Sequence, residues 1–182
     1  MKTLDFLKFL QSKLGGEFDY KSKIGYEDTS SRLSVPRLVL ELGGEHIRFE
    51  IMNKTELYIN VYTKPPHFLK IRHENFATKL LDKIHLHSEV KIGDTEFDDK
   101  YIIEFAKKEI IQKTMNSTFK ECITNLEPFK RFEMTKRDYI LLKDISLKKY
   151  DVEDAEHDIR NMLKIVASCK KVWREEASNN KI

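Results

Sequence analysis

The sequence predicts an α+β fold, with helices packed on one side of a mostly antiparallel sheet. Helical spacing of apolar residues opens the chain at 3–14 and recurs near its end at 152–173. Between them, residues 35–71 alternate apolar and polar side chains and are interrupted by tight turns. Strands that follow one another through hairpins form antiparallel sheets, and amphipathic helices bury their apolar stripes against such sheets.

The first helix is predicted at 3–14, where apolar side chains recur at steps of three and four residues. Gly15 and Gly16 end it, because glycine readily adopts the positive φ of a helix C-cap. A strand is expected to begin near Phe18 and Tyr20, and the polar residues 27–34 to form a loop. The apolar stripe consists of Leu4, Phe6, Leu7, Phe9, Leu10 and Leu14.

The clearest hairpin spans residues 38–51, where apolar residues alternate on both sides of Gly43-Gly44. A glycine pair suits a two-residue turn between strands. A further strand is predicted at 57–61, and Pro65-Pro66 ends it because proline cannot donate a hydrogen bond to a neighbouring strand. Residues 68–71 suit one more short strand.

The second half of the chain is richer in helices. Helices are expected at 75–84, 107–126 and 152–173, with Asn116-Ser117 kinking or dividing the second. A strand is expected at 101–105, and a second hairpin at 129–142 that turns at 135–138. The polar tail 174–182 is expected to fray.

The length and the net charge of the chain limit the number of domains and the kinds of partner that can be expected. The 182 residues suit one compact domain over 1–182, with a change of subdomain near residue 90 as the alternative. The 33 Lys and Arg are interleaved with 30 Asp and Glu, and a net charge of +3 gives little support for a polyanion partner. A cytoplasmic location is expected, because neither a signal peptide nor a membrane-spanning window is found. The chain could also be the soluble part of a larger protein.

No strong catalytic or cofactor motif occurs. The glycine pairs lack the pattern of phosphate-binding loops, and no serine stands in a Gly-x-Ser-x-Gly context. Cys122 and Cys169 are expected to be reduced core residues, and a disulfide would require their two helices to touch. The sequence therefore favours a protein without a cofactor, and leans away from an enzyme.

The segment 92–103 predicts a structural corner. Asp94 can cap a helical turn over 95–100 by accepting a hydrogen bond from the backbone. Phe97 and Tyr101 lie one turn apart and face the same side. The corner residues are Gly93, Asp94, Phe97, Asp98 and Tyr101. We expect them to fasten two layers of the molecule, with the remaining carboxylates solvated.

His85, His87 and Glu89 form the one candidate metal site. In an extended segment these alternate residues point the same way. Two imidazoles and a carboxylate can bind a divalent transition metal. The alternative is an ordinary polar surface beside Leu86 and Val90. His67 and His73 could converge on the same site.

Aromatic and basic residues also mix on the predicted strands, a combination found in proteins that bind single-stranded nucleic acid. The alternative is an ordinary sheet with one core face and one charged face, which the small net charge favours. The residues are Phe49, Tyr58, Tyr62 and Phe68 with Arg48, Lys54, Lys64, Lys70 and Arg72.

The corner, Gly-Asp-x-x-Phe-Asp-x-x-Tyr-x-Ile, resembles a segment of a scattered group of uncharacterised prokaryotic proteins. In that group a β-rich half precedes the motif, and a strand, helix, hairpin and final helix follow. The similarity in order runs from about residue 35 to 172, and Tyr101 stands where phenylalanine is more usual. The resemblance implies architecture and supplies no catalytic residue.

Three hypotheses follow. The leading one is a non-enzymatic domain that binds a protein or small ligand through a sheet face or groove, with a homodimer as one form. The second is a metal-dependent enzyme or sensor that uses His85, His87 and Glu89. The third is weak binding of single-stranded nucleic acid.

Overall fold

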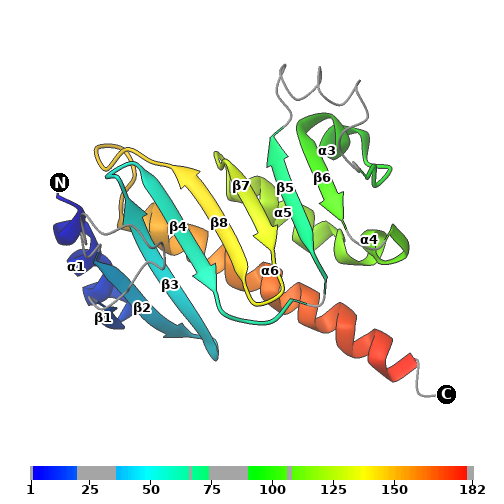
Figure 1. Ribbon diagram of the computed structural model, residues 1–182, viewed down its shortest axis with the longest axis horizontal. Helices are drawn as coiled ribbons and strands as arrows, with labels where there is room; N and C mark the ends of the chain where they lie inside the picture. The colour runs from blue at the N-terminus through cyan, green and yellow to red at the C-terminus, as the bar shows by residue number, and fades with distance from the viewer. Residues whose placement is uncertain (1, 20–35, 66, 74–89, 106–107, 180–182) are drawn as a thin grey trace, which may run out of the picture.

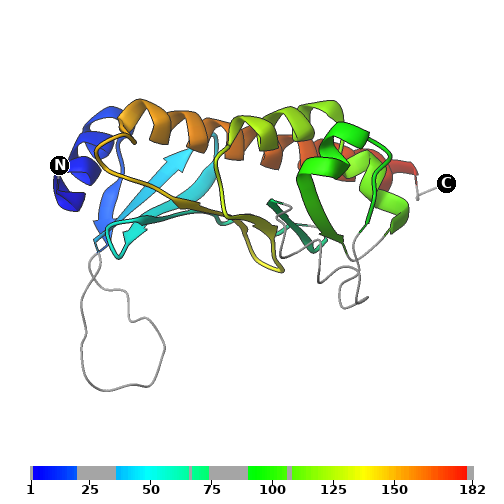
Figure 2. The ribbon, with the colours of Figure 1, turned by 90° about the horizontal axis from the view of Figure 1, so that it is seen from above.

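A computed structural model describes residues 2–19, 36–65, 67–73, 90–105 and 108–179. These residues form one eight-stranded antiparallel sheet with helices on one face, so the predicted α+β class is confirmed (Figures 1 and 2). The strands are ordered β1-β2-β3-β4-β8-β7-β5-β6. Their bounds are β1 (Glu17–Asp19), β2 (Arg37–Leu42), β3 (Glu45–Met52), β4 (Glu56–Val61), β5 (Leu69–His73), β6 (Tyr101–Phe105), β7 (Arg131–Met134) and β8 (Tyr139–Asp144).

The predicted hairpin is the pair β2–β3. Gly43 and Gly44 have φ angles of 61° and 77°, which a two-residue turn of this type requires at both positions. The turn sets the register, so that Leu40 lies opposite Ile47 and Leu38 opposite Phe49. All four side chains therefore point to the same face of the sheet.

The centre of the sheet joins segments that are distant in sequence. Strand β4 pairs with β8, with Ile59 opposite Leu141. Strand β4 is the last of the four strands that follow one another in sequence, and β8 is the first of the group β8-β7-β5-β6 (Figure 1). The group β1-β2-β3-β4 and the group β8-β7-β5-β6 are therefore connected within the sheet through one pair of strands.

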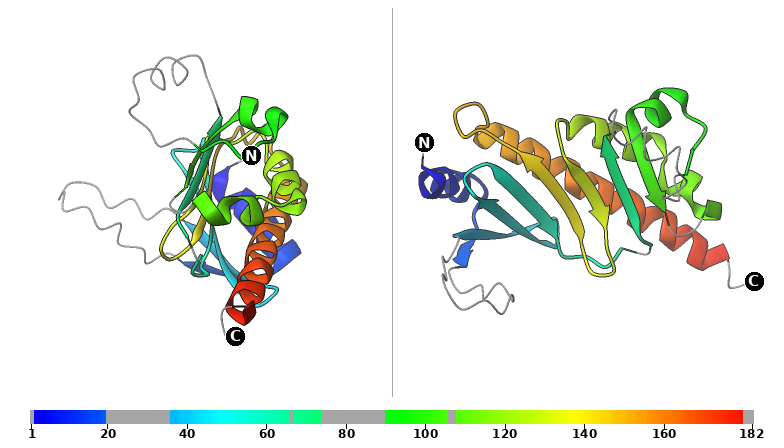
Figure 3. Two further views of the ribbon diagram at one scale, coloured as in Figure 1. Left: turned by 90° about the vertical axis from the view of Figure 1, so that its right-hand side faces the viewer. Right: turned by 45° about the horizontal axis from the view of Figure 1, so that its top comes forward.

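The helices form a second layer on one side of the sheet (Figure 2). They are α1 (Thr3–Leu14), α4 (Lys108–Thr114), α5 (Ser117–Asn125) and α6 (Val152–Asn179), with the short α3 (Thr95–Lys100) directly before β6. Helix α6 crosses the sheet obliquely (Figure 3). The core between the layers includes Phe6 of α1, Phe119 of α5 and Ile159 of α6, all almost fully buried.

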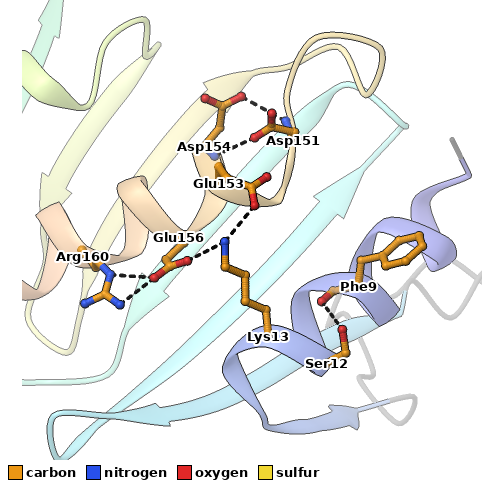
Figure 4. Close-up of polar contacts among 8 residues, drawn as sticks. All are labelled: Phe9, Ser12, Lys13, Asp151, Glu153, Asp154, Glu156 and Arg160. Carbon is orange, nitrogen blue, oxygen red and sulfur yellow. Dashed lines mark hydrogen bonds and ion pairs between the residues drawn. The ribbon is translucent and has the colours of Figure 1, made fainter.

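Helix α1 is held to the sheet by an aromatic contact and to the start of α6 by ion pairs. The Phe6 ring lies against Phe49 of β3, with ring centroids 6.1 Å apart. Lys13 Nζ lies 2.9 Å from a carboxylate oxygen of Glu153 and 2.9 Å from one of Glu156 (Figure 4). The hydrogen bonds that Lys13 donates to these carboxylates raise its pKa.

One of the two alternatives predicted for residues 107–126 is confirmed, and the last helix is longer than predicted. Residues 107–126 form two helices, α4 and α5, because Asn116 caps the second by accepting a hydrogen bond from Phe119 N at 3.0 Å. Helix α6 continues through Asn179, past the expected end at 173, since residues 174–179 contain no glycine or proline to stop it. The helix predicted at 75–84 and the loop at 27–34 lie outside the described residues.

Candidate functional site

The face of the sheet opposite the helices is the candidate functional surface. No helix of the described residues covers it, and we call it the helix-free face (Figure 2). Alternation along the strands determines its composition, since Leu57, Ile59 and Val61 of β4 point into the core and the residues between them point the other way.

Two rows of side chains cross the middle of the helix-free face. In the Arg48 row, Arg48 lies opposite Asn60, Asn60 opposite Ile140, and Ile140 opposite Glu133. In the Tyr58 row, Glu50 lies opposite Tyr58, Tyr58 opposite Leu142, and Leu142 opposite Arg131. Each row therefore has two uncharged residues at its centre, on β4 and β8, and one charge of each sign at its ends.

Exposed aromatic rings lie beside these rows. Tyr62 is 41% exposed and Phe68, directly before β5, is 42% exposed. The guanidinium carbon of Arg48 lies 5.4 Å from the centroid of the Tyr62 ring. Burial of the hydroxyl raises the pKa of Tyr62, and nearby cations oppose this effect. The ring is thus held over the sheet with its exposed part available for contact.

Ion pairs organise the charged residues on both sides of the centre. Arg37 Nε lies 3.0 Å from Glu50 Oε2, and Arg48 Nε lies 3.7 Å from the same oxygen. Arg131 Nε lies 3.4 Å from Glu133 Oε1. Further along the sheet, Glu104 receives both Lys70 at 3.5 Å and Arg72 at 3.2 Å. Cations and carboxylates alternate, so the face has no large region of one sign.

A second feature, a pocket of about 470 Å³, lies on the helix side. Its wall includes a buried group formed by Lys143, Asp158 and Tyr150. Lys143 Nζ donates to both oxygens of Asp158, at 2.9 and 2.7 Å, and the Tyr150 hydroxyl donates to Asp158 Oδ2 at 2.7 Å. Burial raises the pKa of Asp158, and the bonds from Lys143 and Tyr150 counteract this.

This buried group fastens β8 to α6. The carboxylate of Asp158 accepts three hydrogen bonds, and the side chains of Lys143 and Asp158 are only 6% and 2% exposed. A carboxylate so engaged is poorly placed to take a proton from a substrate. The sequence analysis missed this group. The sequence pattern that could have revealed it is a lysine at a core-facing position of β8, together with an aspartate within the apolar stripe of the last helix.

A third polar group connects the corner to the turn between α5 and β7. Glu127 accepts a hydrogen bond from the Tyr101 hydroxyl and lies 2.7 Å from Lys100 Nζ and 3.5 Å from His73 Nε2. Burial alone would raise the pKa of Glu127, but Lys100, Tyr101 and His73 together lower it below its ordinary value. Burial also raises the pKa of the Tyr101 hydroxyl.

The corner residues come together as follows. Asp94 accepts a hydrogen bond from Phe97 N at 3.3 Å and also pairs with Lys120 of α5. The expectation that Asp98 is solvated is wrong, because Asp98 is buried and accepts hydrogen bonds from the backbone N–H groups of Ile92 and Gly93. The rings of Phe97 and Tyr101 lie 4.5 Å apart and are buried. All these contacts are between residues of the chain itself.

The candidate metal ligands His85, His87 and Glu89 lie outside the described residues. Among the residues that are described, no group of three His, Cys, Asp or Glu side chains is arranged to hold a metal ion. His67 contacts Trp173 of α6 and Phe105 of β6, whereas His73 contacts Tyr101 and Phe129.

One of the aromatic residues proposed to stack on nucleic-acid bases is not on the surface. Phe49 is fully buried in the core against α1, so it cannot stack on a base. Tyr58, Tyr62 and Arg48 do lie on the helix-free face. Glu50, Glu104 and Glu133, whose carboxylates would repel phosphates, lie among its cations.

Cys122 and Cys169 are buried free thiols, as expected. Burial raises the pKa of Cys122, and it raises that of Cys169 to about 12. Thiols with raised pKa values are poor nucleophiles, so neither residue is a candidate for covalent catalysis.

Comparison with known proteins supports the fold alone. No family model matches the chain, and no curated protein matches it. The chain is similar in structure to the mycobacterial trehalose monomycolate transport factor A, TtfA, with a TM-score of 0.61 and 7% sequence identity. The alignment covers 90% of this chain and 92% of that one. In the described part of the chain, no helix combines the length and apolarity needed to cross a membrane.

Proposed function

We propose that this chain is a non-enzymatic domain that binds a partner protein through its helix-free face. The observation that carries the proposal is the composition of that face. Tyr58, Ile140 and Leu142, with Asn60 as the fourth central residue, form a largely apolar centre, and arginines and glutamates lie at the ends of the two rows. Protein interfaces combine an apolar centre with a polar rim, and tyrosine and arginine are enriched among the residues that supply most of their binding energy.

The buried carboxylates outside the helix-free face support a binding role, because their hydrogen bonds are made within the chain. In the described residues, the buried carboxylates Asp98 and Asp158 are engaged in internal hydrogen bonds. The structurally similar mycobacterial protein is described as a transport factor, a description that states no reaction. We carry over from it only the idea of a protein that acts by binding.

A photocrosslinking experiment tests the proposal. A benzophenone amino acid replaces Tyr58 or Ile140 on the helix-free face, and Lys164 on the exposed side of α6 serves as the matched control position. We expect crosslinks to a defined protein from the first two positions and none from the third. Equal crosslinking from all three positions, or crosslinking to RNA alone, would refute the proposal.

Binding by the purified partner provides the second measurement. Tyr62→Ala removes an exposed ring at the edge of the face, and we expect it to weaken binding about ten-fold, or roughly 1.4 kcal/mol. The control Phe9→Ala removes a ring that is 61% exposed on α1, and it should leave the affinity unchanged. If both variants bind like the unmodified chain, the face is not the interface.

A further inference from the structure

We infer that the partner of the helix-free face is a second copy of this chain. Two such faces would stack around a twofold axis that runs parallel to the strands, between β4 and β8. This inference rests on the proposed function, and it adds the identity of the partner and the arrangement of the two copies.

The argument begins with the positions of the charges in the two central rows. The Arg48 row has its cation on β3 and its carboxylate, Glu133, on β7. The Tyr58 row has the reverse order, with Glu50 on β3 and the cation, Arg131, on β7. The four charges therefore occupy the corners of a rectangle, with like charges on its diagonals.

A rectangle of this kind is complementary to itself. Rotation about the proposed axis places β3 of one copy over β7 of the other and leaves each row over its own equivalent. Arg48 then faces Glu133 of the second copy, and Glu50 faces Arg131 of the second copy. Every charge at the corners thus meets one of opposite sign, as the closed symmetry of a homodimer requires.

The centre of the face matches under the same rotation. Strand β4 lies over β8, so Tyr58 faces Leu142 and Asn60 faces Ile140 of the second copy. The tyrosine ring therefore packs on an aliphatic side chain at the middle of the contact. Stacked sheets keep their strands nearly aligned and lie about 10 Å apart, which the proposed axis allows.

An axis across the strands would also bring opposite charges together, and the two axes differ in which carboxylate Arg48 meets. An axis across the strands would place Arg48 over Glu50, whose side chain is only 4% exposed. The proposed axis places Arg48 over Glu133, whose side chain is 16% exposed. Glu50 is one of the paired carboxylates on either axis, so the double exchange described below distinguishes the two arrangements.

The cations further from the axis are neutralised within each copy. Arg37 pairs with Glu50 at 3.0 Å, and Arg72 pairs with Glu104 at 3.2 Å. They lie one strand outside the rectangle, where the twist of the sheets moves the two surfaces apart. These charges therefore form the rim of the contact and do not oppose it.

Sedimentation velocity over a concentration series tests the dimer. We expect a reversible monomer–dimer equilibrium for the unmodified chain. Arg48→Glu places two carboxylates opposite each other, and Glu133→Arg places two cations opposite each other. Each should raise the dissociation constant at least about ten-fold. The double variant exchanges the two charges and should restore it to within about three-fold of the unmodified chain.

Two controls accompany these variants. Lys164→Glu on α6 and Glu121→Arg on α5 change the net charge by the same amounts on exposed positions of the helix layer, and they should leave the equilibrium unchanged. The double exchange also tests the axis. Around the perpendicular axis the new residues would face the unchanged Glu50 and Arg131, so a double variant that stays dissociated would refute the proposed arrangement.

A distance measurement avoids any change within the face. A spin label at Lys54→Cys, in the exposed turn between β3 and β4, should show an intermolecular distance of about 15–20 Å, from the spacing of strands and stacked sheets. A label at Lys164→Cys on the helix side should lie well beyond that distance. Burial of Cys122 and Cys169 keeps both from reacting with the label.

A chain that remains monomeric at about 0.2 mM would overturn the inference. That result would leave the proposed function standing if photocrosslinking from Tyr58 still yielded another protein. If the chain were monomeric and no protein were crosslinked from the helix-free face, both proposals would fail.

Discussion

Lys143 is a charged residue at a position that the rest of β8 fills with buried side chains. Tyr139 and Leu141 precede it on the same face of the strand, and both are almost fully buried. The ammonium group is accommodated because Asp158 accepts from it twice. A buried pair of this kind gives little net stability, but the loss of one member leaves an uncompensated charge.

Asp158→Asn should therefore destabilise the fold by about 3–5 kcal/mol, because Lys143 loses its counter-ion while it remains buried. Adding Lys143→Met removes the uncompensated charge and should recover most of this loss, since the new amide oxygen can still accept from Tyr150. Urea unfolding of both variants measures the effect. The exposed control Lys164→Met should stay within about 0.5 kcal/mol of the unmodified chain.

Glu127 gives a pH dependence that follows from its lowered pKa. Its folded pKa lies below the ordinary value of 4.5, so its contribution to stability is present above that value and is lost as the pH falls through the folded pKa. Glu127→Gln should reduce the free energy of unfolding by about 1–2 kcal/mol at neutral pH. The difference from the unmodified chain should shrink below pH 4, and a constant difference across the titration would contradict this account.

At the scale of elements, the turn between β3 and β4 is strained. Residues 53–55 connect the two strands, and Asn53 and Lys54, with positive φ angles of 51° and 65°, are the central residues of a turn in which Thr55 N donates to Met52 O at 3.1 Å. Asparagine tolerates this region better than lysine does. The β2–β3 hairpin has glycines at its positive-φ positions, whereas this turn has none, so the backbone of Lys54 is strained.

Lys54→Gly should relieve that strain and stabilise the protein by about 0.5–1 kcal/mol, because Asn-Gly is a favoured pair for this turn. Thermal unfolding measures the change. Lys136→Gly in the β7–β8 turn is the matched control, because Lys136 is not among the described residues with a positive φ. This control variant should not be more stable than the unmodified chain. An equal gain in both variants would contradict the strain argument.

The elements also show what the sequence could predict. Alternation around Gly43-Gly44 was sufficient for the β2–β3 hairpin, because turn and pattern are local signals. The division of 107–126 into two helices was indicated by Asn116. The pairing of β4 with β8 was beyond prediction, since both strands carry similar apolar patterns and nothing local selects a partner. The central rows of the helix-free face could not be predicted for the same reason.

At the scale of the whole molecule, strands β4 and β8 are the interior of the sheet. Each is paired on both sides, and α6 crosses the opposite face. Strand β1 is a three-residue edge, and β6 is the other edge. The layout predicts a gradient of local stability from the centre of the sheet to its edges.

Amide hydrogen exchange measures that gradient. Amides of Ile59 and Leu141 should exchange at least about ten-fold more slowly than those of Phe18 on β1. The reason is that exchange at the central pair requires separation of the two halves of the sheet, whereas β1 can fray alone. Equal protection at the centre and at β1 would contradict this ranking.

The pairing of β4 with β8 has a consequence for how the protein is made. Tyr58 leaves the ribosome long before Leu142, so the two residues cannot become neighbours until almost the entire chain has been synthesised. A nascent or truncated polypeptide that stops short of residue 139 carries the residues that β3, β4 and β7 contribute to the helix-free face but lacks those of β8. Competence to associate would then arise in a single late step, which protects an unfinished chain from premature assembly.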